Sequence, residues 1–89
     1  MSKRRLPQTH LLLRHMALHG HITQLEAISL YRIFNIKGRI NDLRNQGWRI
    51  LTDMRTDATG KRYARYSLKS QSDRDWLAEL FTNLERETA

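Results

Sequence analysis

The chain has 89 residues, of which 39% are hydrophobic and 28% are charged, and its formal net charge is +7. This length favours a single small domain with a limited core and excludes two separate catalytic domains. The absence of cysteine excludes disulfides, zinc fingers and thiol chemistry and favours a reducing, cytoplasmic location, while the longest apolar cluster (residues 11–13) is too short for a membrane span or signal peptide.

The first predicted element is a helix that follows a basic arm. Residues 1–6 are polar and basic, so we expect them to form a flexible arm. Pro7 suits the first turn of a helix that runs to about His19, and Gly20 suits its end. Three apolar residues fall on one side of this helix: Leu12, Leu13 and Met16.

A capping-box pattern predicts where the second helix begins. Thr23 and Glu26 have the spacing at which each side chain satisfies a backbone amide of the first helical turn. The helix is expected to run to about Tyr31. Its expected buried residues are Leu25, Ile28 and Leu30.

A short turn over residues 32–34 separates this helix from a third. Asn35 is the predicted N-cap, the helix covers residues 35–46, and Gly47 ends it. Its buried stripe is predicted to contain Ile36, Ile40 and Leu43.

Beyond Gly47 the pattern favours strands and then a last helix. Residues 48–55 and 62–69 are rich in aromatic and β-favouring residues around a loop at 57–60, which predicts a hairpin. Ser72 and Asp73 are the expected start of the last helix. Its apolar face either packs on the first helix or, as we favour, forms a homodimer interface: Trp76, Leu77, Leu80, Phe81 and Leu84.

Together these elements predict a mainly helical α+β fold, a winged helix-turn-helix with three helices, a two-stranded wing and a C-terminal helix. Residues 7–69 form the expected domain, with residues 70–89 as the packing or dimerisation helix. No internal repeat or linker appears in the sequence.

The charge is unevenly distributed and favours a polyanionic partner. Residues 1–69 contain fourteen of the sixteen Lys and Arg residues but only four of the nine Asp and Glu residues. We therefore expect double-stranded DNA to be the partner, with the helix at residues 35–46 in the major groove, which accepts one α-helix. No membrane or small-molecule partner is expected.

The residues expected to contact DNA lie on the third helix, the hairpin and the arm. On the third helix they are Asn35, Lys37, Gly38, Arg39, Asn41, Arg44 and Asn45. On the hairpin, expected on the DNA backbone or in the minor groove, they are Arg55, Lys61, Arg62 and Arg65. Possible arm contacts are Lys3, Arg4 and Arg5.

Two of these residues have alternative explanations. Gly38 costs helix stability, which is explained either by a close approach to DNA or by tight packing against the second helix. Arg39 flanks the core and either pairs with Glu26 or contacts a phosphate.

Other chemistries have weaker support. His15 and His19 lie one helical turn apart, but a zinc site needs three or four ligands, so we expect surface histidines and neither metal nor cofactor. No catalytic motif is present, so no enzyme is expected. Trp48, Tyr63 and Tyr66 resemble an RNA-stacking surface, although aromatic residues beside a hairpin are more often core.

Residues 22–50 resemble the small winged helix-turn-helix domains of bacteriophages and prophages. The shared residues are Ile22-Thr23, Leu25-Glu26-Ala27, Tyr31, Ile33, Arg39-Ile40, Leu43-Arg44, Gly47 and Ile50. The chain departs from that pattern at Arg32, where Gly is usual, and at Asn35, Lys37 and Gly38, where Arg and small residues are common. These departures fall on the turn and the reading face and suggest a target site of its own.

The resemblance implies a phage or prophage transcriptional regulator that acts by occupying its DNA site. One alternative is an architectural recombination accessory protein of the excisionase kind, which bends DNA. The other is a phage-encoded inhibitor that uses this fold to bind a host protein.

Overall fold

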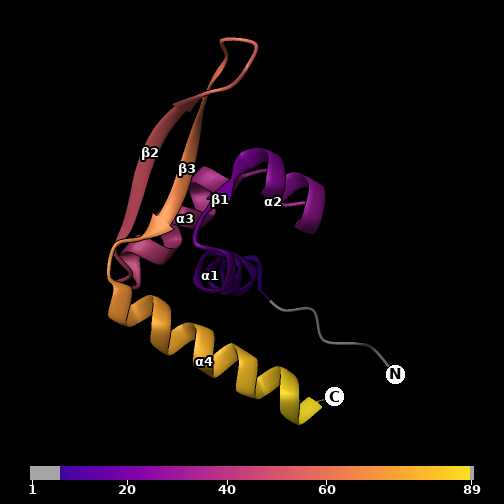
Figure 1. Cartoon of the computed structure of the whole chain (residues 1–89), viewed down its shortest axis with the longest axis vertical. Helices are drawn as coiled ribbons and strands as arrows, with labels where there is room; N and C mark the ends of the chain where they lie inside the picture. Colours follow the sequence, from indigo (N-terminus) through magenta and orange to yellow (C-terminus); the bar gives the residue numbers. More distant parts are fainter. Residues whose placement is uncertain (1–6, 89) are drawn as a thin grey trace.

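The computed structural model describes residues 7–88 of the chain. In chain order, its elements are α1 (Gln8–His19), β1 (Ile22–Thr23), α2 (Gln24–Tyr31), α3 (Ile36–Asn45), β2 (Ile50–Thr56), β3 (Arg62–Leu68) and α4 (Gln71–Thr88). Figure 1 shows the hairpin β2–β3 projecting from the helical body. The predicted mainly helical α+β fold, with three helices, a hairpin and a last helix, is confirmed.

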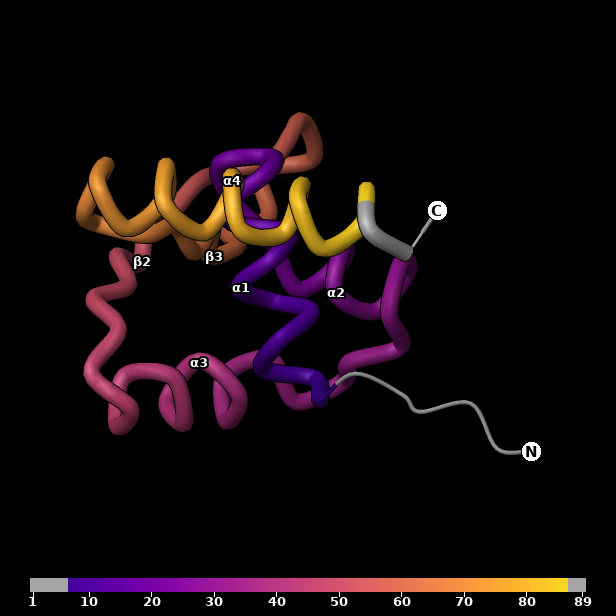
Figure 2. Tube along the Cα trace, turned by 90° about the horizontal axis from the view of Figure 1, so that it is seen from below, coloured from indigo at the N-terminus to yellow at the C-terminus, as the bar shows by residue number. Residues whose placement is uncertain are grey.

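α1 lies at the centre of the molecule, between α3 on one side and α4 on the other (Figure 2). Leu12 and Met16 are fully buried, as predicted, and Gly20 ends the helix with a φ of 94° that favours glycine. His15 is only 4% exposed, so the expectation that the histidines lie on the surface is wrong for this residue. Its burial follows from the same stripe, because residues 12, 15 and 16 share one helical face.

The sheet has three antiparallel strands in the order β1–β3–β2. β2 pairs with β3 along its length from Ile50 opposite Leu68 to Thr56 opposite Arg62. The sequence analysis missed β1, whose Ile22 pairs with Tyr66. This short strand anchors the hairpin to the body, because Ile22 and Tyr66 are both buried in the core.

α2 begins where the capping box placed it. The Glu26 N–H donates to Thr23 Oγ1 at 3.2 Å, and the Thr23 N–H donates to Glu26 Oε1 at 3.0 Å. The predicted burial of Leu25 and Leu30 is wrong, since these side chains are 73% and 59% exposed. The buried residue of this eight-residue helix is Ala27 instead.

The last helix packs on α1, which was one of its two expected arrangements. Ser70 caps α4 by accepting from the Asp73 N–H at 3.2 Å, so the predicted start at Ser72 is two residues late. Leu77 and Phe81 are buried against the body. Arg14 of α1 forms an ion pair with Glu85 of α4. Within residues 7–88, no helix has the length and apolarity needed to cross a membrane.

Candidate nucleic-acid interface

The outer face of α3 carries a strip of exposed polar side chains. Lys37, Asn41 and Asn45 follow one another at intervals of four residues, so they share one side of the helix, and all three are exposed. The opposite side holds the predicted core residues Ile36, Ile40 and Leu43, all buried. The strip therefore presents a cation and two amides to solvent from a helix that the core holds in place.

Gly38 lies in the first turn of α3, directly against the N-cap. The Asn35 side chain accepts from the Gly38 N–H at 3.1 Å. A Cβ at position 38 would lie 2.4 Å from Asn35 Nδ2, and its nearest neighbours all belong to Asn35. The glycine thus makes room for the cap of its own helix, whereas packing against α2 was the predicted structural explanation.

Two arginines of α3 have partners within the chain. The Arg39 Nε lies 3.2 Å from Asp42 Oδ2, so the predicted pair with Glu26 is wrong, and Glu26 serves the α2 cap instead. Arg44 Nη2 donates to the Ile50 carbonyl oxygen at 2.7 Å and to Thr52 Oγ1 at 2.9 Å. Arg44 therefore fastens α3 to β2, a role that the sequence analysis missed.

The loop of the hairpin is fixed by Asp57. Its Oδ1 accepts from the Thr59 hydroxyl at 2.6 Å and from the backbone N–H groups of Thr59 and Lys61 at 2.9 Å. These hydrogen bonds, that of the Thr59 hydroxyl foremost, lower the pKa of the Asp57 carboxyl. Lys61 and Arg62 follow this ordered turn directly, and both are exposed.

The two other basic residues of the hairpin, Arg55 and Arg65, have polar partners within the chain. Arg55 Nε donates to Asp53 Oδ2 at 2.7 Å, an ion pair that offsets its charge and raises the pKa of the guanidinium. Arg65 lies on β3 opposite Asp53 and Thr23 rather than near the loop, and its Nη2 lies 3.0 Å from His21 Nδ1. The hairpin therefore carries two adjacent exposed cations, Lys61 and Arg62, at its loop end.

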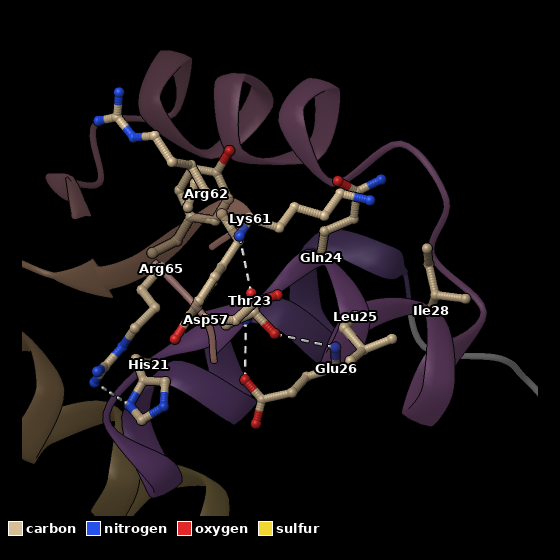
Figure 3. A pocket seen from close by; sticks show the side chains of 13 residues that line it. His21, Thr23, Gln24, Leu25, Glu26, Ile28, Asp57, Lys61, Arg62 and Arg65 are labelled. Atoms are coloured by element: carbon tan, nitrogen blue, oxygen red, sulfur yellow. Dashed lines mark hydrogen bonds between the residues drawn. The ribbon is translucent and has the colours of Figure 1, made fainter. Parts of the chain in front are cut away.

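A groove of about 770 Å³ separates α2 from the hairpin. Figure 3 shows its two walls. α2 supplies Gln24, Leu25 and Ile28 on one side, and the hairpin supplies Lys61, Arg62 and Arg65 on the other. The exposure of Leu25 is explained by this position, because its side chain faces the groove rather than the core.

A partly buried polar cluster around His15 joins α1 to α2. His15 Nδ1 lies 2.7 Å from the Tyr31 hydroxyl, and its Nε2 lies 3.8 Å from Glu26 Oε2. Burial lowers the pKa of His15, and the neighbouring His19 lowers it further. Among residues 7–88, no group of three or more potential ligands is placed to hold a metal ion.

The predicted arm contacts Lys3, Arg4 and Arg5 lie outside the described residues. Pro7, where the description begins, lies beside α3, in a shallow pocket that Arg39 and Asn45 also line. The aromatic residues of the proposed RNA surface are separated by burial: Tyr66 belongs to the core, Trp48 is half-buried and Tyr63 is exposed. They do not form a continuous stacking surface.

Comparison with known proteins agrees with this geometry. The profile of a family described as a winged helix-turn-helix domain matches residues 7–71, which is more than two thirds of the chain. No curated protein and no solved structure matches the chain.

Proposed function

Because the chain belongs to the winged helix-turn-helix family, whose fold suggests DNA binding, we propose that it is a sequence-specific double-stranded DNA-binding regulator. α3 enters the major groove, and the hairpin, the wing of this fold, contacts the backbone or the adjacent minor groove. The protein acts in the bacterial cytoplasm as a phage or prophage transcriptional regulator.

The exposed strip on α3 is the observation that carries the proposal. Asn41 and Asn45 are the residue type that pairs bidentately with adenine, and Lys37 donates to guanine acceptors in the major groove. Asp42, the one acid on α3, is engaged by Arg39. The side chains that point outward therefore combine base-reading amides with positive charge.

The wing and the groove beside it support phosphate contacts. Lys61 and Arg62 stand at the loop end of the wing, across the groove from the first turn of α2. The acids of the groove, Glu26 and Asp57, are engaged in the α2 cap and in the wing loop, so the exposed cations set its charge and favour a phosphate. We therefore assign a DNA strand to this groove, with Gln24 as a further contact that the sequence analysis did not name.

Occupancy of the DNA site is the proposed mechanism. A protein bound through α3 and the wing blocks or recruits polymerase at that site. The proposed mechanism requires no catalytic step.

Fluorescence anisotropy with a random-sequence duplex across a salt series tests the proposal, followed by selection of bound sequences from the same pool. Each neutralised phosphate contributes a slope of roughly −0.9 in log affinity against log salt. We expect a steep slope and enrichment of one motif. Arg86→Ala on α4 is the matched control, since it removes one positive charge outside the proposed interface.

The outcomes separate the alternatives. A steep slope without an enriched motif contradicts sequence-specific regulation and favours an architectural protein, which a DNA-bending assay then identifies. No binding at moderate salt excludes the DNA proposal and favours the inhibitor of a host protein. Equal loss of affinity in Arg86→Ala and Arg62→Ala would show that binding depends on net charge alone.

A further inference from the structure

The outer edge of the wing is an open strand. β2 lies at the end of the sheet order, so only one of its edges is paired, and Figure 1 shows no element of residues 7–88 beside the other. Residues 51–56 are all exposed. An open strand of this length presents backbone donors and acceptors that can pair with another chain.

The hydrogen bonds at both ends of the hairpin establish which residues of β2 direct their backbone groups towards the open edge. The Lys69 N–H donates to the Arg49 carbonyl oxygen, and the Asp57 N–H donates to the Lys61 carbonyl oxygen. The backbone N–H and C=O groups of the odd-numbered residues of β2 therefore bond to β3. In an antiparallel ladder these groups alternate in direction, so those of the even-numbered residues point to the open edge. Thr52, Met54 and Thr56 thus offer their N–H and C=O groups at the open edge.

Arg44 marks the inner limit of this edge. The side chain of Ile50 is buried, but its carbonyl oxygen is directed to the open edge and accepts from Arg44 Nη2 at 2.7 Å. The contact confirms the alternation, because a guanidinium outside the sheet could not reach a carbonyl that bonds to β3. Arg44 also donates to the Thr52 hydroxyl, so it covers one end of the edge and leaves the backbone groups of residues 52–56 open.

We propose that β2 pairs antiparallel with β2 of a second copy of this chain, about a twofold axis at Met54. Met54 then faces Met54 of the second copy, and Thr52 faces Thr56 of the second copy. In each of these pairs both residues donate a backbone N–H and accept through a backbone C=O. Asp53 faces Arg55 of the second copy, and Arg55 faces Asp53. These charged pairs occupy the non-hydrogen-bonded positions, where opposite side chains are closest.

Charge selects this register over its neighbours. A twofold axis at position 53 would place two aspartates face to face, and an axis at position 55 would place two arginines face to face. Like charges directly opposite one another destabilise a strand pair. The ion pair between Asp53 and Arg55 within one chain shows that both side chains already lie on the same face of the sheet.

The paired sheet leaves the candidate DNA interface open. The groove lies at β3 and α2, on the opposite side of the wing from the open edge of β2. Antiparallel extension keeps the same face of both sheets on one side, so the two α3 helices face the same way. The pairing itself does not depend on DNA binding and is tested without DNA.

Sedimentation of the full chain over a range of concentrations provides the first test. We expect the mass to rise from 10.6 kDa towards twice that value. Met54→Pro removes an outward N–H that β3 does not use, whereas Met54→Val keeps it. Proline should weaken the dimer about tenfold or more while valine retains it, and circular dichroism checks that both variants are folded.

A charge exchange tests the pairing of side chains. Asp53→Arg and Arg55→Asp should each weaken the dimer, because each places like charges opposite one another. The double variant restores complementarity and should recover dimerisation relative to both single variants. Additive loss in the double variant would contradict the register.

Cysteine substitution tests the position of the axis, because the natural chain has no cysteine. Met54→Cys places two thiols opposite each other and should form a disulfide-linked dimer on oxidation, since bridged residues need Cα atoms within about 7 Å. Thr52→Cys faces Thr56 of the second copy and should crosslink far more slowly. Equal rates would overturn the register.

Two results overturn the proposal itself. One is a chain that stays monomeric at every concentration. The other is a dimer that survives Met54→Pro and is lost on Leu80→Ser, which would place the interface on α4.

Discussion

The backbone N–H of Gly38 donates a hydrogen bond of 3.1 Å to the side chain of Asn35, and a Cβ on Gly38 would collide with that side chain. The residue that lowers the helix propensity of α3 is thus the one that permits its cap. The two effects are of similar size, because a glycine costs about 1 kcal/mol and an Asn cap contributes about as much.

Gly38→Ala is therefore expected to change stability very differently in two backgrounds. With Asn35 present, the gain in helix propensity is cancelled by displacement of the cap. In an Asn35→Ala chain, the same substitution should raise the free energy of unfolding by about 1 kcal/mol. Urea unfolding of the four chains measures the coupling, and equal effects in both backgrounds would contradict this explanation of Gly38.

Arg44→Ala should destabilise the protein although its side chain is exposed. It removes the two hydrogen bonds that fasten α3 to β2, which corresponds to about 1–2 kcal/mol of unfolding free energy. Lys37→Ala, which removes an exposed cation from the same helix, is the control and should change stability little. Similar denaturation midpoints for both variants would show that the contact contributes nothing.

Asn41→Ala and Arg62→Ala should separate base reading from phosphate binding. The Asn41 variant is expected to relax sequence preference while it retains affinity for random duplex. The Arg62 variant should bind every duplex more weakly and reduce the salt slope by about one. Anisotropy on the selected motif and on a scrambled duplex measures both effects, and uniform losses in both variants would contradict this division of roles.

As the pH falls below neutral, protonation of His15 should contribute to a decrease in the free energy of unfolding. Burial lowers its pKa in the folded state below 6.5, so the folded protein binds this proton less readily than the unfolded chain. The stabilisation is complete above pH 6.5 and is lost as the pH falls towards the lowered value. Chemical unfolding between pH 7.5 and 5 should show a shallower decline for His15→Gln, and an unchanged decline would assign the effect to other groups.

The apolar face of α4 should divide into two classes by substitution. Phe81→Ala should cost about 3–5 kcal/mol and Leu77→Ala about 2–5 kcal/mol, because both side chains are buried. Trp76→Ser and Leu80→Ser should be much milder, since Trp76 is 57% exposed and Leu80 is also exposed. Thermal unfolding ranks the four variants.

The parts of the fold that depend on neighbouring residues could be predicted from the sequence. The cap of α2 joins Thr23 to Glu26, and the core stripe of α3 repeats within ten residues, so local spacing contains the information. The pairing of Ile22 with Tyr66 joins residues more than forty positions apart, and no local pattern indicates it.

The candidate site shows the same division. The exposed strip of α3 follows from helical periodicity, which separates Lys37, Asn41 and Asn45 from the core stripe. The contacts of Arg65 with His21 and of Arg44 with Ile50 depend on how the hairpin twists against the body. For the same reason the exposed Leu25 could not be distinguished from a core leucine by spacing alone.

The central position of α1 keeps α3 and α4 apart (Figure 2). A fluorescent dye or a fused protein attached to the outward side of α4, for example at Trp76, would therefore lie away from α3 and leave its outer face unobstructed. That side of the molecule offers an attachment point for tracking the protein while α3 and the wing remain accessible.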